Sequence, residues 1–170
     1  MSKKKNKLKG VGKLNEGIKA AFKGFGIKKM ILGQSYAYYY YSKKVMFKLT
    51  ENEYEDEWFK EFIFERFGYE VEHPFILSIL HEIGHHKANE EIVGAISDFC
   101  NAEKARISKE MESANERESK ILEWQYFNLP DEIMATQWAV SYAQTHPKKI
   151  KKMWKRCEET LVEFYAKNID

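Results

Sequence analysis

The apolar and polar positions divide the chain into one short helix, a group of strands and a long helical region. Apolar residues recur at helical spacing from Lys13 to Phe25, which predicts a helix there. Residues 29–50 instead hold short aliphatic and aromatic runs separated by turn-forming residues. This pattern predicts two or three short antiparallel strands. The runs are Met30–Leu32, Tyr36–Tyr41 and Val45–Leu49.

Helical patterns cover most of the chain after residue 50. Thr50 and Glu53 have the spacing of a capping box, at the start of a helix that Gly68 would end. Pro74 suits the first turn of the next helix, which is predicted over residues 75–87. The other predicted helices cover residues 89–127, with a break near 107–109 and a polar, exposed segment at 109–120, then 131–144 and 148–165. These elements predict an α+β fold, mostly helical, with a small antiparallel sheet before the helix at 75–87.

Length and composition fit one globular domain. The chain has 170 residues, of which 44% are hydrophobic and 32% charged, as is typical of a soluble protein with a substantial core. We expect a disordered basic arm over residues 1–12 and a single domain over 13–170. No apolar run is long enough to span a membrane, and the basic start lacks the apolar segment of a signal peptide. Cys100 and Cys157 lack the spacing of a disulfide framework or a cysteine zinc site. We therefore expect a reducing compartment, the cytoplasm of a bacterial or phage-infected host cell.

The net charge of +2 conceals an uneven distribution. Residues 1–29 contain ten Lys and one Glu, whereas residues 51–135 contain 21 acidic and 8 basic residues. The lysine-rich start could make a weak contact with nucleic acid or an anionic surface. No nucleic-acid-binding motif accompanies these lysines, so a solvated, mobile terminus is the preferred explanation.

The segment His81-Glu82-Ile83-Gly84-His85 has the pattern H-E-x-x-H. On a helix, residues four apart share one face, so both imidazoles could bind a single zinc ion. Zinc lowers the pKa of a bound water toward about 7, and Glu82, one step round the helix, would accept its proton as the general base. The apolar residues before the motif predict a buried helix, and Gly84 favours a close approach by another element. Two ordinary surface histidines remain the alternative interpretation.

The motif resembles the active-site helix of the zincin metallopeptidases, H-E-[LIF]-G-H. Segment 75–86 is similar to the compact phage and bacterial members related to the ImmA/IrrE peptidases. That resemblance implies a helix, a small sheet, the motif helix and then a third zinc ligand on a later helix. Residues 132–139 resemble the gluzincin stretch E-x-x-A-[DN]-x-[FY]-A, which implies Glu132 as that ligand. Thr136 stands where this family has Asp or Asn supporting a ligand histidine, so the orientation of that histidine is in question.

Other residues remain candidates for the third ligand. Glu91 lies six residues after His85, where an extended form of the motif has a third histidine, but Ala88 replaces the glycine that this form needs. Asp131 adjoins Glu132, but we predict that it is the N-cap of the helix instead.

Two further residues are candidates for stabilising an oxyanion, namely His146 and Tyr142, near the end of the third-ligand helix. Zincins bind an extended peptide along an edge strand, so the resemblance implies a protein or peptide substrate on residues 45–49 or 36–41.

Three functions compete. The motif favours a zinc metallopeptidase with Glu82 as the general base. The first alternative is a zincin-fold binding or regulatory protein of phage type with little or no proteolytic activity. The second is a helical interaction protein without a metal. Metal content and a Glu82→Gln variant would distinguish them.

Overall fold

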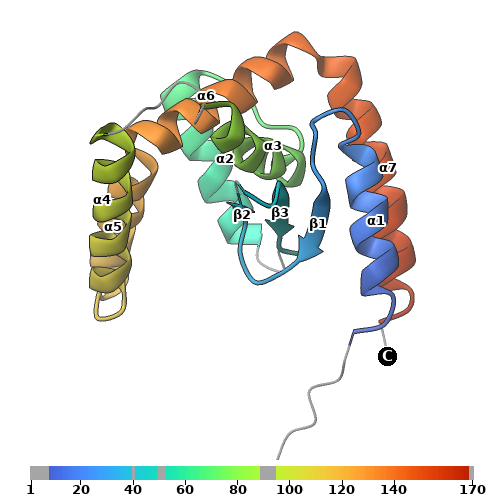
Figure 1. Cartoon of the computed structure of the whole chain (residues 1–170), viewed down its shortest axis with the longest axis horizontal. Coiled ribbons are helices and arrows are strands. Elements are labelled where there is room, and N and C mark those ends of the chain that lie inside the picture. The colour runs from blue at the N-terminus through green and yellow to red at the C-terminus, as the bar shows by residue number, and fades with distance from the viewer. Residues whose placement is uncertain (1–7, 40, 50–52, 89–94, 169–170) are drawn as a thin grey trace, which may run out of the picture.

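The computed structural model describes residues 8–39, 41–49, 53–88 and 95–168 (Figure 1). Its elements in chain order are α1 (Val11–Ala21), β1 (Lys29–Leu32), β2 (Ala37–Tyr39), β3 (Lys44–Phe47), α2 (Glu53–Phe67), α3 (Pro74–Ala88), α4 (Ala95–Met111), α5 (Glu116–Phe127), α6 (Pro130–Thr145) and α7 (Pro147–Tyr165). Figure 1 shows α4 and α5 side by side at one end, α1 and α7 at the other, and α6 running between them. The predicted α+β class, mostly helical with a small sheet before the motif helix, is confirmed.

The sheet is mixed, so the prediction of antiparallel strands is wrong for one pair. The strand order is β1-β3-β2, with β1 parallel to β3 and β2 antiparallel to it. Val45 and Phe47 in β3 are fully buried, which suits the central position between two partners. β2 is therefore an edge strand, whereas residues 45–47, the start of the other candidate edge, belong to the central strand.

Helix α3 passes through the main hydrophobic core. Its apolar side chains Ile76, Leu77, Ile79, Leu80 and Ile83 are all buried. Helix α6 packs closely along α3. The closeness is clear at Gly84, where an added Cβ atom would lie 2.4 Å from the carbonyl oxygen of Ala135. The expectation that Gly84 allows a close approach is confirmed. In this way the α3–α6 contact brings the H-E-x-x-H motif against the first turns of α6.

The α4–α5 hairpin has a small core of its own, built from Ile107, Leu122 and Leu129. The break predicted near residues 107–109 is wrong, because burial of Ile107 keeps the chain helical as far as Met111. The turn falls at residues 112–115, where Asn115 and Glu118 form a capping box at the start of α5. Residues 109–120 are mostly exposed, as predicted.

The predicted starts of α6 and α1 differ from the observed ones. The N-cap of α6 is Leu129, followed by Pro130 at the first helical position, so Asp131 lies inside the first turn and its predicted capping role is wrong. The capping box predicted for Thr50 lies outside the described residues. So do residues 1–7 of the predicted arm, and α1 begins at Val11, two residues earlier than expected. Within the described ranges, no helix has the length and apolarity needed to cross a membrane.

The close contact at Gly84 predicts a large effect of one added methyl group. Gly84→Ala should lower the free energy of unfolding by about 1–3 kcal/mol or more, because the new Cβ meets backbone atoms that cannot rotate away. Gly12→Ala is the matched control, since a Cβ there has no neighbour within 4 Å. The free energy of unfolding of that variant should be unchanged or higher by up to about 1 kcal/mol. Urea unfolding of both variants checks this, and equal stabilities would contradict the close packing.

Candidate metal centre

His81 and His85 lie one turn apart on α3 and face the same carboxylate. Their ring centroids are 4.7 Å apart and the rings are nearly perpendicular. The Nε2 atom of His81 is 3.0 Å from Oε2 of Glu132, and Nε2 of His85 is 3.4 Å from Oε1 of the same residue. Glu132 comes from the first turn of α6 and is 1% exposed. Two histidines four residues apart and a glutamate 47 residues further along the chain therefore converge at one buried point.

The three side chains fit a divalent metal ion. One ligand atom from each lies within 4.8 Å of the others. Ligand atoms that bind one zinc ion in tetrahedral geometry are about 3.3 Å from one another. The distances from Glu132 to the two histidine Nε2 atoms, 3.0 and 3.4 Å, are close to this value. Two imidazoles and one carboxylate are also a donor set that zinc accepts. Small movements of these side chains would be enough to bring all three onto one ion.

Thr136 fixes the orientation of His81. Its Oγ1 donates a hydrogen bond to the backbone carbonyl oxygen of Glu132 at 2.8 Å and lies 2.9 Å from Nδ1 of His81. Because the single hydroxyl proton is already used, the oxygen accepts the hydrogen bond from Nδ1–H. Nε2 is then the nitrogen that is available to a metal. Thr136 thus supports the histidine as the Asp or Asn of the resembling family would, although its side chain is shorter.

Lys104 on α4 is an unexpected member of the cluster. Its Nζ lies 2.5 Å from Oε1 of Glu132 and also pairs with Oδ2 of Asp131. Burial alone would lower the pKa of Lys104, but the two carboxylates outweigh burial and raise that pKa above its ordinary value. The ammonium group therefore neutralises Glu132 and shares its Oε1 atom with His85. No spacing or motif in the sequence indicates this contact, because it depends on how α4 packs against α6.

The Glu132 carboxylate is ionised in this environment. Its burial favours the neutral form, but the hydrogen bonds and charges of His81 and His85 outweigh burial and hold the pKa of Glu132 well below its ordinary value. Glu132 also lies in the first turn of α6, where the helix dipole favours a negative charge.

Glu82 lies beside this cluster and is 8% exposed. Burial raises the pKa of its carboxyl group from 4.5 to about 7, and nearby Glu132 adds to the effect. The charges of His81 and Lys104 act in the opposite direction, as does a hydrogen bond from the backbone N–H of Tyr38. The contact with Tyr38 joins the motif helix to strand β2.

Tyr126 on α5 is a second residue that the sequence did not indicate. Burial raises the pKa of its phenol to about 12, and Glu132 contributes further. Lys104 lies 5.4 Å from the centroid of the Tyr126 ring. The hydroxyl group is therefore neutral near pH 7.

The structure does not bring Tyr142 and His146 to this cluster. Tyr142 follows Glu132 by ten residues on α6, about 15 Å along the helix axis. Its ring stacks on His146, with centroids 4.4 Å apart, and on Trp138. This arrangement does not support the oxyanion role considered for either residue. The competing third ligand, Glu91, lies outside the described residues.

Comparisons of the chain with models of known protein families, with curated proteins and with solved structures found no match.

The Lys104–Glu132 ion pair predicts that Lys104 competes with a metal for the carboxylate. Lys104→Met should therefore bind Zn²⁺ at least about tenfold more tightly, because a positive charge next to the site is removed. Lys109→Met, on an exposed position of the same helix, is the control and should bind as the wild type does. Competition with a chromophoric chelator measures both affinities. Unchanged or weaker binding by Lys104→Met would show that the ammonium group does not oppose the ion.

The raised pKa of Glu82 predicts a pH-dependent stability of the metal-free chain. The unfolded chain loses this proton near pH 4.5, whereas the folded chain keeps it until about pH 7. The contribution of Glu82 to the free energy of unfolding is therefore fully present below pH 4.5 and is lost as the pH rises to about 7. Relative to the wild type, Glu82→Gln should gain about 1–3 kcal/mol between pH 4 and pH 8, because glutamine cannot ionise.

Urea unfolding in the presence of a chelator measures this difference. Glu65→Gln, at an exposed position on α2, is the control and should remain parallel to the wild type across the pH range. Parallel curves for Glu82→Gln and the wild type would contradict the raised pKa.

Proposed function

We propose that the chain is a zinc-dependent metallopeptidase in which His81, His85 and Glu132 bind the ion and Glu82 is the general base. The observation that carries the proposal is the convergence of two Nε2 atoms and one carboxylate at a buried point beside the Glu82 carboxyl group. The H-E-x-x-H resemblance supports it independently, because the motif is a property of the sequence and does not depend on where the fold places Glu132. The order of helix, small sheet, motif helix and later ligand helix also agrees with that resemblance, apart from α2, which lies between the sheet and the motif helix.

The number of ligands supports a catalytic rather than a structural ion. Structural zinc sites are usually closed by four protein ligands, whereas catalytic sites have three and leave a position for water or substrate. Among the described residues, the group that could bind a metal has three members. Asp131, which adjoins Glu132 in the sequence, is paired with Lys104 and is not a member of this group.

The chain's own groups have distinct tasks in this proposal. A bound zinc ion would supply a Lewis acid that polarises the peptide carbonyl and acidifies a water molecule. Glu82 would accept the proton of that water and transfer it to the leaving amine. Thr136 holds the His81 ring in place, and Lys104 and Tyr126 provide a cation and a neutral hydroxyl near Glu132.

Strand β2 is the proposed position of the substrate. It is an edge strand of the sheet, and α3 packs against it. The backbone N–H of Tyr38 reaches the Glu82 carboxyl group, so the free edge of β2 adjoins the proposed base. An extended peptide that pairs with this edge would bring its backbone carbonyls toward the metal centre.

Metal content and peptide hydrolysis together test the proposal. Purified wild-type chain should contain about one zinc ion, and Glu132→Ala should lose it, because one of three ligands is removed. Glu110→Ala, at an exposed position on α4, is the control and should retain the ion. Glu82→Gln should retain zinc and lose about 100- to 10,000-fold of the cleavage rate on a random peptide library followed by mass spectrometry.

Each result has a definite consequence. A zinc-loaded wild type that cleaves no member of the library would contradict the peptidase assignment. It would favour a metal-binding regulatory protein. Zinc retained in Glu132→Ala but lost in Glu91→Ala would transfer the third ligand to Glu91.

A further inference from the structure

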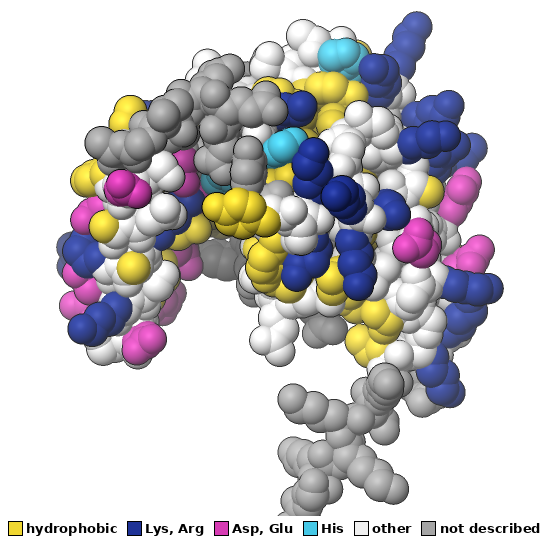
Figure 2. Space-filling view, in the orientation of Figure 1, with side chains coloured by type: hydrophobic (Ala, Val, Ile, Leu, Met, Phe, Trp, Pro, Cys, Tyr) yellow, Lys and Arg dark blue, Asp and Glu magenta, His cyan; other side chains and the backbone are white. Residues whose placement is uncertain are grey.

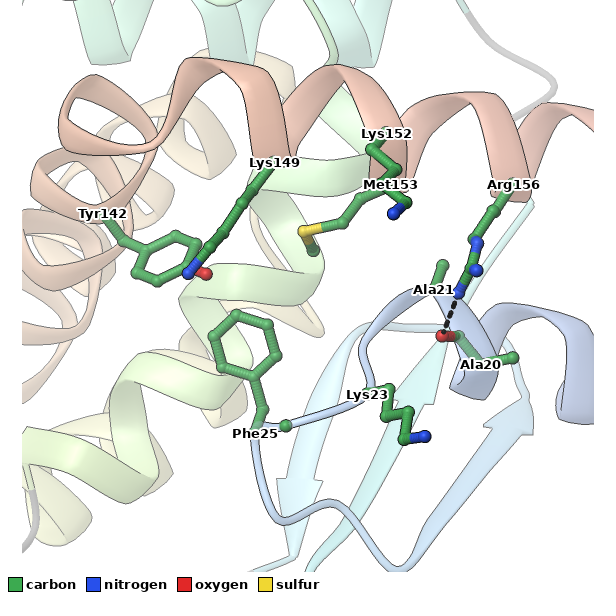
Figure 3. A pocket seen from close by; sticks show the side chains of 10 residues that line it. Ala20, Ala21, Lys23, Phe25, Tyr142, Lys149, Lys152, Met153 and Arg156 are labelled. Carbon is green, nitrogen blue, oxygen red and sulfur yellow. Dashed lines mark hydrogen bonds between the residues drawn. The ribbon is translucent and has the colours of Figure 1, made fainter.

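A hollow lined by basic and aromatic side chains lies between the end of α1 and the first half of α7 (Figure 3), and none of the proposed metal ligands lines it. Its volume is about 440 Å³. The side chains that matter here are Lys23, Lys149, Lys152, Arg156, Phe25 and Tyr142. Figure 3 shows the two rings at one end of the hollow and three of the basic groups toward the other.

The charge of the hollow is of one sign. Four of its lining side chains are basic and none is acidic. None of these four forms an ion pair with a carboxylate of the described residues. The Arg156 guanidinium donates a hydrogen bond to the backbone carbonyl oxygen of Ala20, at 3.3 Å. Figure 2 shows Lys and Arg side chains gathered over this end of the molecule. An anion is therefore the ligand class that the surface favours.

The stability of α7 does not explain this distribution of charge. Residues 147–156 contain six basic and no acidic residues, whereas residues 157–165 contain three acidic and no basic ones. This is the reverse of the order that the helix dipole favours, and lysines three or four apart repel one another on a helix. A bound anion would offset both effects.

The aromatic side chains indicate which kind of anion fits. Trp138, Tyr142 and His146 form a stack along α6, with neighbouring centroids 5.5 and 4.4 Å apart. Phe25 meets the Tyr142 ring at 5.1 Å. Lys149 lies 6.0 Å from the Tyr142 centroid, so a positive charge and a ring are adjacent. Basic groups that follow a phosphate backbone, next to rings on which bases stack, are typical of single-strand binding.

We propose that this hollow binds single-stranded nucleic acid. The phosphates would contact Lys23, Lys149, Lys152 and Arg156, and a base would stack at Tyr142 and Phe25. A duplex fits less well, because its bases are already stacked and cannot reach the rings. An anionic membrane also fits less well, since none of the exposed large apolar side chains of the described residues lines the hollow. The site does not depend on the proposed peptidase activity.

Binding of fluorescent dT12 and U12 by the full chain, measured by anisotropy, tests the proposal. Lys149→Gln/Lys152→Gln should weaken binding at least about tenfold and reduce the slope of log affinity against log salt by about 1.4. Lys148→Gln/Lys151→Gln is the matched control, because it removes the same charge from α7 outside the hollow. The affinity of the control for the oligonucleotides should fall by less than about threefold. Equal losses in the two pairs would overturn the proposal, since they would indicate general charge attraction.

The aromatic contribution needs its own variants. Tyr142→Leu should weaken single-strand binding but leave the salt slope unchanged, because stacking is lost and the phosphate contacts remain. Phe25→Leu is the second variant and should act in the same direction if Tyr142→Leu fails to fold. A 12-base-pair duplex should bind more weakly than either single strand. Binding to phosphatidylserine vesicles that is as strong as to the oligonucleotides, or affinity unchanged in Phe25→Leu, would overturn the proposal.

Discussion

The buried carboxylate of Glu132 is the feature on which the arrangement of the site depends. A carboxylate that is 1% exposed must be neutralised, or its desolvation would oppose folding. Two imidazoles approach it from α3 and an ammonium group from α4, so three helices converge on one charge. Because Lys104 supplies a permanent cation, the fold does not need a metal to compensate Glu132. This differs from small zinc domains, in which the ion itself supplies the folding free energy.

The geometry of the site follows from one close helix contact. Gly84 lies between the two metal-site histidines in sequence, and its missing side chain admits the backbone of Ala135. Ala135 in turn lies between Glu132 and Thr136, so the residues that meet at the contact are the neighbours of those that form the cluster. A larger residue at position 84 would separate α3 from α6 and move the Glu132 carboxylate away from both histidines. The unfavourable glycine within a helix is therefore explained by the site and not by the stability of α3.

The sequence predicted the elements and the core of the site well, because both depend on local patterns. The H-E-x-x-H spacing and the resemblance at residues 132–139 pointed to His81, His85 and Glu132, and the structure brings these three side chains together in a group that could hold a metal ion. The parallel pairing of β1 with β3 was missed, since alternating apolar residues do not specify which strand is central. Lys104 and Tyr126 were missed because their roles arise from the packing of the α4–α5 hairpin, which no short-range pattern encodes. Tyr142 was considered for the site because it follows Glu132 closely in sequence, but the rise of α6 carries it about 15 Å away.

Helix α6 connects two regions of opposite chemical character. Its first turn carries Asp131 and Glu132 within the acidic part of the chain, and its last turn carries Tyr142 beside the basic α1–α7 end. About 15 Å along the helix axis separates the two ends, and an effective dielectric constant near 20 reduces the interaction of two unit charges at that distance to about 1 kcal/mol. A cation at the first end and an anion at the second would therefore attract one another only weakly. The helix sets the distance between them, so a single ligand that contacts both ends must span about 15 Å.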